Sequence, residues 1–137
     1  MKRELIHNVK VLPYTSESAI DREGFLSGVL AVSLSKATGA PTGISVKVAI
    51  TECDTRAGSF SAVKDKQVFA DKIADDDGAI TLEADAAGGD LFNIDLDLIG
   101  CKQFVKATVT VTCTDGSSPT CTATCAIALG DTANQPV

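Results

Sequence analysis

The sequence predicts an all-β protein, an antiparallel β-sandwich of Ig-like or jelly-roll-like type, with a barrel-like arrangement as the alternative. Apolar and polar residues alternate with a period of two in several segments, and turns rich in Gly, Pro and Asp separate those segments. No window of about twelve or more residues shows the helical period. With 137 residues, 45% of them hydrophobic, residues 1–137 are expected to form a single domain with its own core.

Five segments have strong strand patterns, in which apolar residues fall on one face and polar or small residues on the other. In one of them, Val46 and Val48 alternate with Ser45 and Lys47. Weaker patterns predict four shorter strands. In chain order the strong segments are 25–34, 44–51, 91–98, 105–113 and 121–129, and the weaker ones are 9–12, 60–63, 67–69 and 79–82.

The last two strong segments predict a hairpin closed by the loop 114–120. In this register Cys113 pairs with Cys121 and Val105 with Leu129, so every inward residue meets an inward residue. The outer face then carries a ladder of Thr, which is a good β-former on a solvated pleat. Residues 1–8 are predicted to be an N-terminal arm or a short helical turn, and 130–137 a C-terminal tail.

The charge argues against two classes of partner. Twelve Lys and Arg against eighteen Asp and Glu give a net charge of −6, which opposes binding to nucleic acid or to an anionic membrane. No apolar run approaches the roughly 20 residues of a membrane span, and no secretory signal is recognisable, so synthesis in the cytosol is expected.

The acidic residues are concentrated in residues 65–97. This segment holds ten carboxylates and two Lys, so its charge is −8 and the rest of the chain carries +2. An acidic belt of this kind would fit a basic patch on a partner.

The run Asp75-Asp76-Asp77-Gly78 raises the question of calcium. The EF-hand template fails, because it would place Ile73 where the first Asp ligand belongs and Ala84 where the bidentate Glu belongs. An irregular site built on Asp75 and Asp77 is one alternative, and a solvated turn is the other. We otherwise expect neither a metal nor a cofactor.

The reactive residues do not form a catalytic pattern. His7 is the single His and lies in the predicted arm, no nucleophile elbow surrounds any Ser, and an enzyme is therefore not expected. The five Cys lack zinc-ligand spacing and are interpreted as buried, reduced thiols, although a Cys113–Cys121 bridge is allowed by the predicted hairpin. An enzyme would require an unseen cluster around Cys53 or Cys101.

Six segments follow one another along most of the chain: HNVKVLP at 7–13, VKVAITECD at 46–54, GSFSAV at 58–63, GCKQFVKATV at 100–109, AIALGD at 126–131 and the final Pro136-Val137. In the order of these segments and in its ending, the sequence resembles the small all-β structural proteins that tailed bacteriophages and prophages encode near the major capsid gene. The sequence departs from this pattern in its Cys count and its acidic middle.

The resemblance implies a virion protein that decorates or stabilises a capsid, with the major capsid protein and copies of itself as partners. Its contact residues would lie in the arm and the tail, with His7, Asn8, Gly130, Pro136 and Val137 as candidates. A tail or head–tail connector component is the alternative in the same system. A small ligand-binding or adhesion β-sandwich, with or without assistance from calcium, is the alternative of another class.

Overall fold

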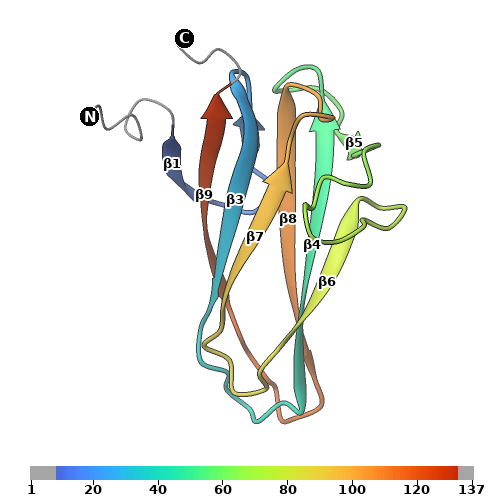
Figure 1. Cartoon of the computed structure of the whole chain (residues 1–137). Helices are drawn as coiled ribbons and strands as arrows, with labels where there is room; N and C mark the ends of the chain where they lie inside the picture. Colours follow the sequence, from blue (N-terminus) through green and yellow to red (C-terminus); the bar gives the residue numbers. More distant parts are fainter. Residues whose placement is uncertain (1–8, 133–137) are drawn as a thin grey trace, which may run out of the picture.

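The computed structural model describes residues 9–132, and this part of the chain folds into two antiparallel sheets packed face to face (Figure 1). The sheets formed by residues 9–132 do not close into a barrel, so the predicted sandwich is confirmed. The strands of the described residues are β1 Lys10–Tyr14, β2 Ala19–Asp21, β3 Phe25–Leu34, β4 Gly43–Cys53, β5 Ser61–Ala62, β6 Ala79–Ala84, β7 Leu91–Asp97, β8 Phe104–Thr114 and β9 Ala123–Thr132.

The strand order is that of a jelly roll. Four antiparallel pairs are nested along the chain, β1 with β9, β2 with β8, β3 with β7 and β4 with β6. Two further pairings, β3 with β9 and β4 with β8, complete sheet A in the order β1-β9-β3-β7 and sheet B with β8 between β2 and β4. The short β5 lies on the same edge of β4 as β6. Nested pairs rolled into two facing sheets define the jelly roll, so of the two predicted sandwich types this one is observed.

The core lies between the two sheets and follows from the alternation. Leu30 and Val32 of β3 face inward from sheet A, while Val46 and Val48 of β4 face inward from sheet B, and all four are fully buried. Burying a side chain of this size contributes about 1.5–3 kcal/mol. The five strong segments are therefore confirmed as strands.

Tyr14 connects the two sheets at the end of β1. Its hydroxyl donates to the carbonyl of Ser18 at 2.7 Å and accepts a hydrogen bond from the amide of Ala107 in β8 at 2.9 Å. Burial raises the pKa of Tyr14 above 10.0, so the hydroxyl keeps its proton at neutral pH. This one side chain ties the edge strand of sheet A to sheet B.

The predicted hairpin is wrong, because β8 and β9 lie in different sheets. Loop 114–120 crosses the end of the sandwich and packs on the loop before β4, where Ser117 donates to the carbonyl of Gly39 at 2.8 Å. Two strands with alternating apolar residues bury those residues equally well when they pair within one sheet and when they face each other across the core. The alternation therefore did not determine whether β8 pairs with β9. The Thr side chains of β8 instead line the outer face of sheet B.

Smaller differences concern the weak segments and the strand ends. The segment 67–69 forms a turn with a single bridge from Phe69 to Leu96, and the three-residue β2 was not predicted. β9 continues through Thr132, so the predicted tail begins too early. The described residues include no helix long and apolar enough to cross a membrane.

Candidate functional site

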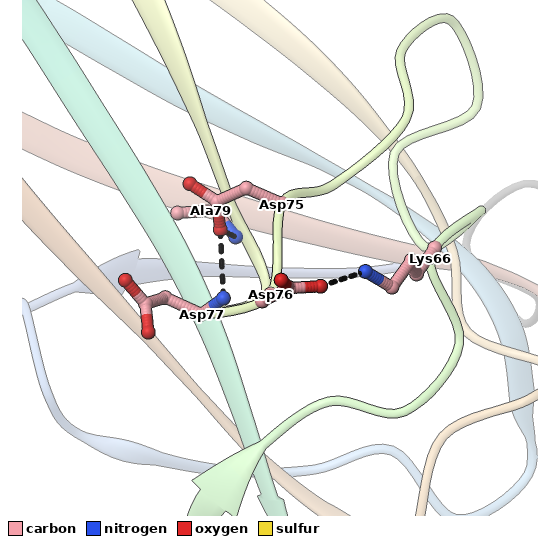
Figure 2. Close-up of polar contacts among 5 residues, drawn as sticks. All are labelled: Lys66, Asp75, Asp76, Asp77 and Ala79. Atoms are coloured by element: carbon pink, nitrogen blue, oxygen red, sulfur yellow. Dashed lines mark hydrogen bonds and ion pairs between the residues drawn. The ribbon is translucent and has the colours of Figure 1, made fainter.

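The predicted calcium residues lie in the tight turn that leads into β6 (Figure 2). One carboxylate oxygen of Asp75 accepts hydrogen bonds from the amides of Asp77 at 2.9 Å and Ala79 at 3.0 Å. Gly78 has a φ of +71°, and a Cβ there would lie 2.7 Å from the carbonyl oxygen of Ile50, so only glycine fits. The backbone geometry of the turn therefore explains why Asp75 and Gly78 occur there.

The other two carboxylates of this turn point to separate lysines. Asp76 pairs with Lys66, and this charged hydrogen bond lowers the pKa of Asp76 below 3.8. Asp77 lies 3.9 Å from the ammonium of Lys47. In the part of the chain that the structure describes, no three His, Cys, Asp or Glu side chains are grouped as metal ligands. This geometry favours the solvated turn, and an irregular calcium site at Asp75 and Asp77 stays the alternative.

The carboxylates of the acidic segment 65–97 are spread over several elements. Those of Asp85 and Asp90 accept hydrogen bonds from nearby backbone amides in the β6–β7 connection. Asp95 and Asp97 lie exposed on β7, at the edge of sheet A. The acidic surface that a partner can reach therefore includes the turn before β6, the outer side of β7 and the exposed Asp71, Glu83 and Asp85.

The candidate interface residues are only partly described. His7, Asn8, Pro136 and Val137 lie outside the described residues. Gly130 is described, and it is paired with Ser27 inside β9. Its assignment to a tail beyond the strands is therefore wrong, because β9 continues for two residues beyond it and Thr132 still pairs with Phe25 of β3.

All five Cys are free thiols in the structure. Burial, with the nearby Glu52 carboxylate adding to it, raises the pKa of Cys101 to about 12, so this thiol is protonated and a poor nucleophile at neutral pH. Cys125 also has a raised pKa, caused by burial. With the hairpin gone, the proposed geometry for a Cys113–Cys121 bridge no longer exists.

Sequence reasoning missed a buried carboxylate beside Cys101. Glu52 is 3% exposed, and its two oxygens accept hydrogen bonds from the amides of Lys64 and Lys102, both at 3.2 Å. These bonds attach two loops to the end of β4. The signal was available, because continuing the alternation of Val48 and Ile50 by one step places Glu52 on the inner face.

The outer faces of the two sheets differ in chemistry. In sheet A, Val29 is in register with Ala128, and Ala31 with Ala126, so these side chains share the outward side. Val11 and Pro13 of β1 extend this side to the sheet edge, and Val11 is 66% exposed. We call these six residues the apolar outer face. On sheet B most of the corresponding positions are polar or charged, although Ala49, beside Thr108, is apolar. The polar and charged positions are Thr108, Thr110, Thr112, Ser45, Lys47, Thr81 and Glu83.

A shallow groove of about 550 Å³ continues the apolar outer face toward the end of the sandwich where the described chain begins and ends. Its floor is low because Ser27, Ala128 and Gly130 have small side chains. Val9 lines it near β1, and Ile99, which is 64% exposed, lines it beyond β7. We call this hollow the terminal groove. Its remaining lining includes the carboxylates Asp95, Asp97 and Asp131.

Comparison with known proteins adds no relative: no protein-family model, curated protein or solved structure matches this chain.

Proposed function

We propose that this chain is a non-enzymatic structural subunit of a bacteriophage virion, made in the host cytoplasm, that decorates or stabilises the capsid. The observation that carries the proposal is the apolar outer face on a jelly-roll sandwich. Jelly rolls recur in viral capsid proteins, although they also occur in lectins and cupins. The sequence resemblance supports the first of these settings.

The apolar outer face is the proposed attachment surface. Ala126, Ala128 and Ala31 are half-buried, and their small side chains let a partner approach the strands closely. Contiguous apolar residues at a surface mark interaction sites. Asp95 and Asp97 lie exposed on the edge strand β7, and Lys10 and Asp131 lie near the strand ends of β1 and β9, so charges surround an apolar centre in the usual arrangement of a polar rim. The partner is the major capsid protein lattice, whose symmetry would also bring copies of this chain together.

Binding to capsids tests the proposal directly. Purified protein is mixed with empty capsids assembled from the phage's major capsid protein, and the capsids are sedimented. We expect saturable binding with a fixed number of copies per capsid. Rings or tubes formed by the protein alone, with no binding to capsids, would support the tail or connector alternative and contradict ours.

The predicted arm has its own test. A chain that lacks residues 1–8 is compared with the full chain in the same sedimentation experiment. Weaker binding would place contacts in the arm, as the sequence predicts. Unchanged binding would remove the arm from the contact surface and leave the apolar outer face as the attachment site.

A further inference from the structure

The terminal groove has a composition that selects its ligand. Its lining includes aliphatic side chains such as Val29 and Ala128 beside small ones, and β7 contributes the carboxylates of Asp95 and Asp97. Among the described residues no Lys or Arg lies within ion-pair distance of these two carboxylates. A fitting ligand therefore has aliphatic side chains next to a Lys or an Arg.

The chain itself contains such a segment immediately before the groove. Residues 1–8 read Met1-Lys2-Arg3-Glu4-Leu5-Ile6-His7-Asn8, with two basic residues followed by two large aliphatic ones. Val9, the next residue, already lines the groove. The segment is thus tethered to the groove, and tethering gives a short segment a millimolar effective concentration.

The distances allow the segment to cross the groove. In the row at this end of sheet A, Gly130 pairs with Ser27, and Ser27 pairs with Asp97. From β1 to β7 there are three strand spacings of about 4.8 Å, or about 14 Å. Six residues in extended conformation, from Val9 back to Arg3, span about 20 Å at roughly 3.3 Å per residue.

We propose that residues 1–8 occupy the terminal groove of their own chain, with Leu5 and Ile6 over its aliphatic side chains and Lys2 and Arg3 beside Asp95 and Asp97. The groove then serves as a receptor for a basic and aliphatic peptide. This inference concerns the free protein and does not depend on the proposed function, so failure of capsid binding would leave it intact.

Amide NMR spectra provide the first test. Spectra of the full chain and of a chain lacking residues 1–8 are compared at several concentrations. We expect shift differences at groove positions such as Val29, Asp95 and Ala128 that do not change on dilution. Spectra that differ only next to Val9 would overturn the proposal, and differences that vanish on dilution would assign the segment to a second copy and overturn its own-chain form.

Proteolysis of two matched charge variants provides the second test. Trypsin cleavage after Arg3 is followed by mass spectrometry in the full chain, in Asp95→Asn/Asp97→Asn and in the control Asp76→Asn/Asp77→Asn. We expect cleavage to be about three- to tenfold faster in the groove variant, as the loss of two exposed ion pairs implies, and unchanged in the control. Equal rates in all three proteins would contradict the ionic part of the proposal.

Discussion

The two outer faces of the sandwich are built on the same alternating strand pattern, on sheets of four and five strands, and they differ in which residues occupy the outward positions. On sheet B, Lys47 is flanked by Thr110 and Thr81, so water solvates that face. On sheet A, Ala126 is flanked by Pro13 and Ala31. The inward residues supply the core, and the apolar outward residues of sheet A are not part of it. The difference therefore points to sheet A as the face that meets a partner.

The largest expected effect comes from a single charge placed on the apolar outer face. Ala126→Asp puts a carboxylate at the centre of the apolar outer face, outside the terminal groove, and we expect capsid affinity to fall about 100-fold because the charge would be buried unpaired. The matched control is Thr110→Asp at the centre of the outer face of sheet B. Equal affinities for the two variants in the sedimentation experiment would show that the faces do not differ in function.

The next effect concerns the link between the two sheets. Tyr14→Phe removes the hydroxyl that bonds Ser18 and Ala107, and it leaves a buried amide and a carbonyl without these partners. We expect the free energy of unfolding to fall by about 1–3 kcal/mol in urea denaturation. Capsid binding by the folded variant should stay the same. A stability equal to that of the parent chain would mean that Tyr14 does not hold the sheets together.

A smaller effect is the pH dependence of stability that the buried thiol of Cys101 causes. The pKa of Cys101 is about 12 in the folded protein and near 9 when unfolded, so the folded state keeps a proton that the unfolded state loses. The contribution of this proton to the free energy of unfolding is fully present below about pH 9 and is lost as the pH rises toward 12. At pH 10 we expect the loss to be about 1 kcal/mol relative to pH 8.

Urea denaturation at pH 8 and pH 10 measures this loss, with Cys101→Ala as the comparison. Other groups titrate in the same range, including Tyr14, whose pKa is also raised. The prediction is therefore that the drop between the two pH values is smaller in the variant. An identical drop in both proteins would show that Cys101 ionises normally.

The smallest expected effect tests the acidic turn beside sheet B. Because Asp75 already accepts two backbone hydrogen bonds and Asp76 and Asp77 point to different lysines, we expect millimolar calcium to leave the melting temperature unchanged. A melting temperature that calcium raises and a chelator restores would reveal a bound ion. It would favour the ligand-binding or adhesion alternative over a capsid subunit.

The sequence alone predicted the fold class because each long strand buries a complete face. The segment 25–34 was predicted with the observed ends. Its large apolar residues Leu30, Val32 and Leu34 all lie on one face of the strand, and that face is buried. The partners of β8 and β9 were not predictable in the same way, because inward residues satisfy the alternation whether they pair within a sheet or face each other across the core. Short β2, with three residues, is below the length at which alternation is readable.

The candidate site was less predictable than the fold. Alternation shows that Ala126 and Ala128 point outward, but only the pairing with β3 and β1 shows that they join Ala31, Val29 and Val11 in one patch. The terminal groove depends on the same pairing, because its floor combines small residues from β3 and β9. Residues that are far apart in the chain define both surfaces.

An electron cryomicroscopy reconstruction of capsids saturated with the protein would test the central claim most directly. We predict that the sheet β1-β9-β3-β7 faces the shell, with Ala126 and Ala31 in the contact, and that Thr110 of β8 faces solvent. A reconstruction with the β8–β4 face against the shell, or capsids that carry no added density, would contradict the account.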